Sequence, residues 1–242
     1  GYKALNESGN KVTGEVEALV RWQHPVRGLV PPLEFIPFAE QTGFVRQLTL
    51  WVFDRAAALC GQLRAQGLSL RLSVNLSTRD MLDVDLPARL EQILQRHDAP
   101  AESFCLEITE SAIMDEPQRA LATLNTLSQR GFALSIDDFG TGYSSLAYLK
   151  RLPVDELKID KSFVMNMQED EDDAKIVRST IDLAHNLGLT VVAEGVENGR
   201  ILEQLRDLVC DEAQGYHMAK PMAADAFAHW CQRWRETQAV AV

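Results

Sequence analysis

The sequence lacks the cysteine and histidine spacings that mark most soft-metal sites. Its four cysteines include no C-x-x-C pair, and its five histidines form no H-E-x-x-H or similar pattern. We therefore expect no structural zinc and no imidazole-bound metal. The cysteines are expected to be reduced core residues of a cytosolic domain; they are Cys60, Cys105, Cys210 and Cys231.

Long apolar runs and an excess of basic charge are also missing. No apolar stretch is long enough to cross a membrane, and no secretory signal opens the chain. The net charge of −11 argues against binding of nucleic-acid polymers through a basic face. The acidic run 169–173 is typical of a solvated helix start, where negative charge suits the helix dipole. We expect a cytoplasmic domain, and the sequence leaves open whether the full-length protein is membrane-anchored.

Strand-like and helix-like patterns alternate along the 242 residues, 46% of which are hydrophobic. Helical spacing is found in 47–66, 86–97, 117–130, 174–187, 199–208 and 223–235. This alternation predicts parallel βαβ units, and the number of units suits one α/β domain, a TIM-like (β/α)8 barrel. An open doubly wound sheet is the alternative, but its usual glycine-rich phosphate turn is absent. No linker or repeat is found, so we expect a single domain over residues 1–242. Because the chain begins abruptly at Gly1, we also expect it to be excised from a longer protein.

Side chains that carry oxygen or nitrogen stand at the ends of many of the expected strands. The apolar run 132–136 ends in Asp137 and Asp138, which precede a Gly-Thr-Gly loop. Two carboxylates about 4 Å apart repel each other by on the order of 4 kcal/mol unless water, a shared proton or a cation intervenes. Catalytic groups of a barrel gather at the carboxyl ends of its strands, so we expect one polar focus. Its further members are Glu17, Asn75, Glu107, Glu110, Lys158, Glu194 and Gln214.

Carboxylates and an amide, without thiolate or imidazole, select a hard cation such as magnesium, manganese or calcium. Carboxylates from separate strands suit two ions about 3.5–4 Å apart, which together favour in-line displacement at phosphorus. Lys158 could orient the attacking water or stabilise phosphate charge, or it could simply neutralise surplus carboxylates. Arg21 follows Glu17 by four residues on the same expected strand face, and it could offer a bidentate fork to phosphate. Alternatively, Arg21 is an ordinary surface arginine without a role in binding.

Metal-assisted phosphoester hydrolysis is therefore the reaction that these residues favour. Single-metal enolisation is the competing barrel chemistry. It usually needs a further lysine or histidine base at the strand ends, and Lys158 is the one candidate in the sequence.

The segment Glu17-Ala18-Leu19, followed by Val20-Arg21-Trp22, resembles the signature of the EAL domain family. The likeness covers nearly the whole chain in the family's order, through 34–40, 73–77, 106–110, 137–142, 157–160, 193–197, 214–216 and Pro221. The resemblance implies a cyclic di-GMP phosphodiesterase that opens the ring to linear pGpG with magnesium or manganese. It further implies a homodimer near the Asp137 loop and flanking sensory or GGDEF-type domains in the full-length signalling protein.

The resemblance also implies a metal-binding role for six residues. The ligands of one ion fall on Glu17, Asn75, Glu107 and Asp137. Asp137 bridges to the second ion, which Asp138 also binds, and Glu194 lies nearby as a ligand or water-holding carboxylate. Calcium, with its longer and looser coordination, is expected to inhibit.

Other matching residues carry roles in catalysis, in loop support and in substrate binding. Lys158 matches the lysine that orients the hydrolytic water, and Glu110 matches the glutamate that braces the loop from Asp137 to Ser145. The substrate contacts fall on Leu19, Arg21 (to phosphate), Glu197 (on the guanine side) and Gln214 (lining the site).

Two positions depart from the family pattern. Lys3 stands where the first strand usually has glutamine, and Met218 stands where an aromatic residue is common. Some relatives lack the metal residues and only bind the nucleotide. Because every ligand position is present here, we expect hydrolysis, with a binding-only receptor as the alternative.

Overall fold

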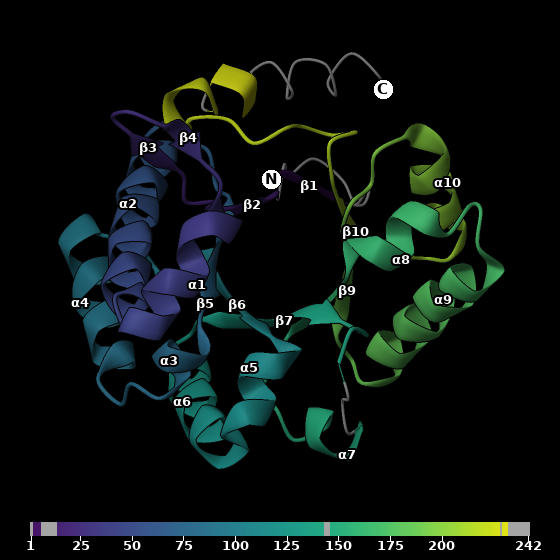
Figure 1. The fold of residues 1–242 in the computed structure, drawn as a ribbon, viewed down its shortest axis with the longest axis horizontal. Coiled ribbons are helices and arrows are strands. Elements are labelled where there is room, and N and C mark those ends of the chain that lie inside the picture. Colours follow the sequence, from purple (N-terminus) through teal and green to yellow (C-terminus); the bar gives the residue numbers. More distant parts are fainter. Residues whose placement is uncertain (1, 6–13, 143–145, 228, 232–242) are drawn as a thin grey trace.

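The core of the protein is a closed barrel of eight strands (Figure 1). The computed structural model describes residues 2–5, 14–142, 146–227 and 229–231, without the side chains of residues 2–5. Around the barrel the strands follow the order β1-β10-β9-β8-β7-β6-β5-β2. Their bounds are β1 Tyr2–Leu5, β2 Glu15–Glu17, β5 Arg71–Leu76, β6 Phe104–Thr109, β7 Ala133–Phe139, β8 Glu156–Ile159, β9 Thr190–Ala193 and β10 Glu212–Gln214.

The predicted (β/α)8-type barrel is confirmed, with one difference in strand direction. β1 is antiparallel to both neighbours, and Lys3 pairs with Gln214 of β10 on one side and with Glu15 of β2 on the other. The remaining barrel pairs are parallel. A parallel crossover needs a dozen or more residues. The connection 6–14 between β1 and β2 is shorter than that, so these two strands can pair only in opposite directions.

Helices surround the barrel on the outside (Figure 1). They are α1 Pro32–Thr42, α2 Val45–Ala65, α3 Thr78–Met81, α4 Leu86–His97, α5 Glu110–Asp115, α6 Pro117–Gln129, α7 Leu146–Leu149, α8 Lys161–Asn166, α9 Glu171–Asn186, α10 Gly199–Asp207 and a helical stretch over 224–227 and 229–231. Five of the six expected helices are found; the sixth, expected over 223–235, is helical over 224–227 and 229–231, and residues 228 and 232–235 are outside the described residues. The sequence did not predict α1, which begins at the second of two consecutive prolines and contains a third, or the hairpin of β3 Trp22–His24 and β4 Gly28–Val30.

The hydrophobic core lies between the helices and the outer face of the barrel. Phe53 of α2, for example, packs against Phe104 of β6, with ring centroids 4.9 Å apart. As expected, the four cysteines are buried and reduced. No helix in the described part of the chain is long and apolar enough to cross a membrane.

Side chains alternate between the two faces of each barrel strand. In β6, Leu106 and Ile108 belong to the core beneath the helices, whereas Glu107 between them is excluded from that core and fully buried. The same alternation places Asp137 of β7 and Lys158 of β8 inside the barrel, because their neighbours Ile136 and Leu157 pack outward. The interior of this barrel is therefore lined with polar groups.

The acidic run before α9 caps the helix, as the sequence predicted. The Asp170 carboxylate accepts hydrogen bonds from the backbone N–H groups of Asp172 (2.8 Å) and Asp173 (3.4 Å). We expect Asp170→Ala to lower the free energy of unfolding by about 0.5–2 kcal/mol. Chemical denaturation would measure this, with Asp182→Ala at an exposed position of the same helix as the control. Asp170→Asn should cost less than Asp170→Ala because asparagine still caps; equal losses would contradict the capping role.

Candidate active site

The carboxyl ends of the barrel strands bring the polar residues expected from the sequence to one place. Glu17 and Gln214 are the last residues of β2 and β10, and Glu194 directly follows β9, where its N–H still donates to the Ile159 carbonyl (3.2 Å). Asn75, Glu107, Asp137 and Lys158 lie within β5, β6, β7 and β8. The predicted polar focus therefore exists at this end of the barrel.

The ammonium group of Lys158 lies at the centre of this focus. Its Nζ is 2.6 Å from Glu194 Oε1, 3.0 Å from Glu107 Oε2 and 3.2 Å from Asp137 Oδ1. Lys158 and Glu107 are both fully buried. Burial opposes the charge on Lys158, but Glu107 and then Glu194 outweigh it and raise the lysine pKa well above its usual value. The lysine is therefore a permanent cation that joins three strands.

Glu17 is held ionised by a different set of contacts. Its Oε1 accepts a hydrogen bond from Asn75 Nδ2 (2.8 Å), and its Oε2 accepts one from Gln214 Nε2 (2.7 Å). Burial disfavours the charge of this carboxylate, but Lys158 and the two amide donors prevail and lower its pKa to about 2. Both oxygens of Glu17 are thus fixed in orientation at the mouth of the barrel.

The glycine after Gln214 explains how that amide is positioned. A Cβ atom at Gly215 would lie 2.1 Å from the Val196 carbonyl oxygen and 2.4 Å from its nitrogen, so no larger residue fits. The close approach lets the Val196 N–H donate to the Gln214 carbonyl (3.0 Å). The Gln-Gly pair therefore ties the end of β10 to the segment that follows Glu194.

A bulge in β7 turns two consecutive carboxylates toward the same site. Neighbouring residues of a regular strand point to opposite faces. In β7 the register with β8 shifts between Ile136 and Phe139, and Asp138 has a left-handed φ of 54°. As a result, carboxylate oxygens of Asp137, Asp138 and Glu194 lie within 4.8 Å of one another. The sequence showed the adjacent pair but not the bulge that aims both side chains together.

Within the described part of the chain, carboxylates outnumber cations at this site. Burial and then Asp137 raise the pKa of Asp138 to about 6. Burial likewise raises the pKa of Glu194 to about 7, against the opposing effect of Lys158. The described site contains five carboxylates around one ammonium. The donor set, hard oxygens with excess negative charge, fits two divalent cations such as magnesium or manganese.

Glu110 lies behind the loop that follows β7. Its Oε2 accepts a hydrogen bond from the Gly140 N–H (3.4 Å), and its Oε1 would be only 2.8 Å from a Cβ atom at Gly142. The buried carboxylate therefore packs directly against residues 140–142, in keeping with the expected bracing. The far end of that loop, including Ser145, is outside the described residues.

Of the four expected substrate contacts, Gln214 lies within the site, hydrogen-bonded to Glu17, and the other three are at the surface. Leu19, Arg21 and Glu197 are exposed. β2 ends at Glu17, so the expectation that Arg21 shares a strand face with Glu17 is wrong: the strand gives way to an irregular segment before β3. Glu17, Leu19 and Arg21 do line one cavity of about 560 Å³, beside α2 and the segment 219–224.

One residue near the site was not singled out from the sequence. Asp160 accepts a hydrogen bond from the Ser162 N–H (2.9 Å) and is hydrogen-bonded to the Asp138 side chain. Asp160 stands two residues after Lys158, a strand period that could have identified it. Of the two departures from the family pattern, Met218 is buried, and the side chain of Lys3 is outside the described residues.

Comparisons with known proteins agree with this geometry. The EAL domain family model matches residues 6–221. The chain is 43% identical over 214 residues to the bifunctional diguanylate cyclase/cyclic di-GMP phosphodiesterase MucR of Pseudomonas aeruginosa, covering 87% of this chain and 31% of that protein. It is 40% identical over 224 residues to the cyclic di-GMP phosphodiesterase PdeR of Escherichia coli, covering 91% and 34%. The chain thus spans about a third of the length of these curated relatives.

A solved structure of the P. aeruginosa MucR phosphodiesterase in complex with c-di-GMP superposes on the barrel with a TM-score of 0.87. The two share 41% identity, and the match covers 93% of this chain and 91% of that one. The family match, the sequence relatives and the fold agree: the chain belongs to the EAL domain family.

Proposed function

We propose that this domain hydrolyses cyclic di-GMP to linear pGpG with the help of two divalent cations, magnesium or manganese. The observation that carries the proposal is the excess of carboxylates over protein cations at the open end of the barrel. Two relatives that match most of this chain are named cyclic di-GMP phosphodiesterases. A substrate with two negative charges can enter such an acidic site once bound cations reverse the local field.

Two sets of residues would hold the cations. Glu17, Asn75, Glu107 and Asp137 would hold the first ion, and Asp137, Asp138 and Glu194 would hold the second. The Asn75 Nδ2 donates to Glu17, which leaves the amide oxygen as its ligand atom. When bound, the cations supply Lewis acidity for the phosphate oxygens and the attacking water. Glu110 acts indirectly, through the loop after Asp138.

Lys158 acts as a fixed positive charge. Three carboxylates within 3.2 Å of its Nζ keep it protonated, so it is a poor base, and the competing enolisation chemistry loses its one candidate base. The ammonium instead orients the hydrolytic water and stabilises charge that develops on the phosphate. Arg21 offers its guanidinium to phosphate, Leu19 and Glu197 contact the rest of the nucleotide from the surface, and Gln214 contacts it from within the site.

A binding-only receptor remains the second candidate function, and one measurement separates the two. We expect purified protein, cyclic di-GMP and magnesium or manganese to yield pGpG, resolved by chromatography. Excess chelator should abolish the product and added magnesium restore it, whereas calcium should inhibit because its ligand distances are longer and less regular. Binding of cyclic di-GMP without any pGpG would support the receptor, and product formation in excess chelator would exclude the two-metal mechanism.

The proposed bridging ligand can be tested with an isosteric change. Asp137→Asn keeps the shape of the side chain but removes charge shared by both ions, so turnover should fall by about 10²-fold or more. The rise in melting temperature on adding magnesium should shrink as well, because a weaker metal site gives less linked stabilisation. Asp207→Asn, at an exposed surface position, is the control. Wild-type turnover in Asp137→Asn would contradict the ligand assignment.

Substitutions of Lys158 and Arg21 should have different effects, the first on turnover and the second on substrate binding. Lys158→Met should abolish hydrolysis while magnesium-supported affinity for cyclic di-GMP persists, because the lysine acts on the water and the transition state. Without metal this variant should also melt earlier, since buried carboxylates lose their cation. Arg21→Ala should instead weaken binding by roughly 1.5–3 kcal/mol, the value of a charge-assisted hydrogen bond. Calorimetry on both variants decides, and the reverse pattern would mean that the two roles are exchanged.

A further inference from the structure

A cavity of about 560 Å³ lies in the wall of the domain, between α2 and the outer face of the barrel. Its inner walls are side chains of the hydrophobic core, among them Val16 of β2, Leu72 of β5 and Ala56 of α2. Protein interiors are close-packed, and few of their voids are larger than a water molecule. Cavities of about 300–1,000 Å³ are instead typical of small-molecule binding sites. This cavity therefore has the size of a ligand site.

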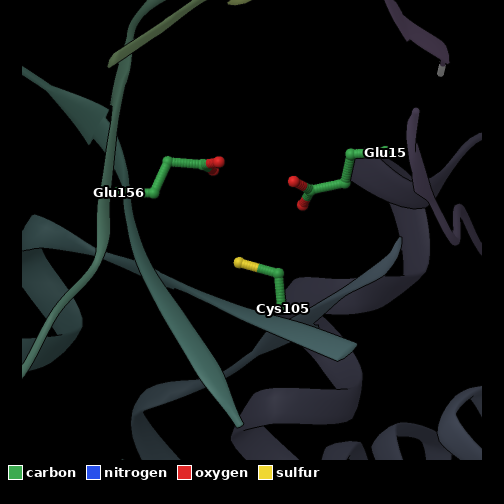
Figure 2. Close-up of side chains that lie close together, drawn as sticks. All are labelled: Glu15, Cys105 and Glu156. Atoms are coloured by element: carbon green, nitrogen blue, oxygen red, sulfur yellow. The ribbon is translucent and has the colours of Figure 1, made fainter. Parts of the chain in front are cut away.

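The cavity is separate from the polar interior of the barrel. Figure 2 shows that interior, where the carboxyl groups of Glu15 and Glu156 point toward each other beside Cys105. Val16 follows Glu15 on β2, so its side chain points to the opposite face of the sheet, where it belongs to the hydrophobic core. A ligand beside Val16 would thus be divided from the barrel interior by the sheet itself.

Large apolar side chains continue from the cavity to the surface of the protein. Leu19, Leu29, Trp51 and Met222 all line the cavity, and each is more than one-third exposed. Exposed apolar residues that are scattered singly need no explanation, but a group of them around one cavity is typical of a binding site. The mouth and the inner walls therefore both favour a ligand with an apolar body.

Three exposed cations line the same cavity: Arg21, Arg55 and Lys220. Within the described part of the chain, none of them forms a salt bridge with a carboxylate. The Arg55 guanidinium lies over the ring of Trp51, and Lys220 Nζ lies over the ring of Tyr216, each 5.6 Å from the ring centroid. These contacts hold positive charge beside apolar surface and leave it available to an anion.

The charge of the cavity lining is opposite in sign to that of the whole chain. The chain has a net charge of −11, whereas the described lining has three cations and one carboxylate, that of Glu17. Both oxygens of Glu17 accept hydrogen bonds from amides inside the mouth of the barrel, those of Asn75 and Gln214. An apolar cavity with a cationic mouth is complementary to a ligand that has an apolar body and an anionic head.

We propose that this cavity binds a long-chain fatty acid, with its acyl chain between α2 and the barrel and its carboxylate at the mouth, where Arg55 and Lys220 supply positive charge. The carboxylate would accept charge-assisted hydrogen bonds there while it remains in contact with water. The acyl chain would be removed from water by the core side chains of the inner walls. The ligand would also touch the segment 18–21, which follows Glu17, and would thus contact the rim of the active site from outside the barrel.

A series of fatty acids of increasing length tests the cavity by calorimetry. Octanoate, decanoate, dodecanoate and tetradecanoate are titrated into the whole chain below their micelle concentrations and without divalent cations. Affinity should rise about fourfold with each added methylene group until the acyl chain fills the cavity, and should then level off. Dodecan-1-ol should bind about tenfold more weakly than dodecanoate, or worse, because it makes no charge-assisted hydrogen bond. Equal binding of the alcohol, or affinity that rises without a plateau, would overturn the proposal.

Substitutions at the mouth and on the inner wall locate the ligand. Arg55→Gln combined with Lys220→Gln should lower the affinity for dodecanoate about tenfold or more. Arg178→Gln, which changes an exposed arginine of α9 away from the cavity, should leave the affinity unchanged. Ala56→Leu takes up space on the inner wall, so the plateau in affinity should come at a shorter acyl chain. If Ala56→Leu does not fold, the two charge substitutions still decide, because both residues are at the surface.

Three further results would overturn the proposal. Absence of saturable binding by any of the four fatty acids would mean that another part of the chain covers the cavity. Wild-type affinity for dodecanoate after the combined charge substitutions would place the ligand elsewhere on the protein. Association with phosphatidylglycerol vesicles, but not with dodecanoate, would indicate contact with a membrane surface instead. The cavity lies outside the barrel, so each of these measurements can be made whether or not the domain hydrolyses cyclic di-GMP.

Discussion

The architecture of the open end of the barrel depends on the buried ammonium group of Lys158. Removing a charge from water costs several kcal/mol, which the protein recovers only if strong partners surround it. Glu107, Asp137 and Glu194 provide those partners from three different strands. Among the described residues they leave a surplus of negative charge, and the proposed binding of divalent cations rests on this surplus. One electrostatic arrangement therefore joins the strands and prepares the chemistry.

The two-residue period of the strands extends the polar lining below the open end of the barrel. Inward positions repeat every second residue, so Glu15 and Glu17, or Cys105 and Glu107, line successive layers of one interior. The residues between them pack outward against the helices. In such a domain the hydrophobic core lies between the barrel and the helices, and the barrel interior can hold charged groups. The (β/α)8 framework is thus shared with other barrels, but its interior carries polar groups where bulky apolar residues are usual.

Much of the site could be predicted from the sequence, because polar residues that interrupt apolar strands show both the period and the carboxyl end. Three features could not. The direction of β1 follows from a connection length, not from a hydrophobic pattern. The placement of Asp138 depends on a bulge that exists only when β7 meets β8. Arg21 lies beyond the end of β2, which could not be located from the sequence because apolar residues such as Val20 continue the strand-like pattern. Each depends on pairing with another part of the chain, which local patterns do not encode.

The position of β1 has a consequence for how the protein is made. β1 is hydrogen-bonded between β2 and β10, so the first strand of the barrel to be synthesised pairs with Gln214 in the last strand of the barrel. The barrel cannot close until the ribosome has released β10, and the acidic interior stays open to water and ions until then. Such contacts between distant segments slow folding. Metal ions and chaperones in the cell thus meet a nascent chain whose charged interior is still accessible.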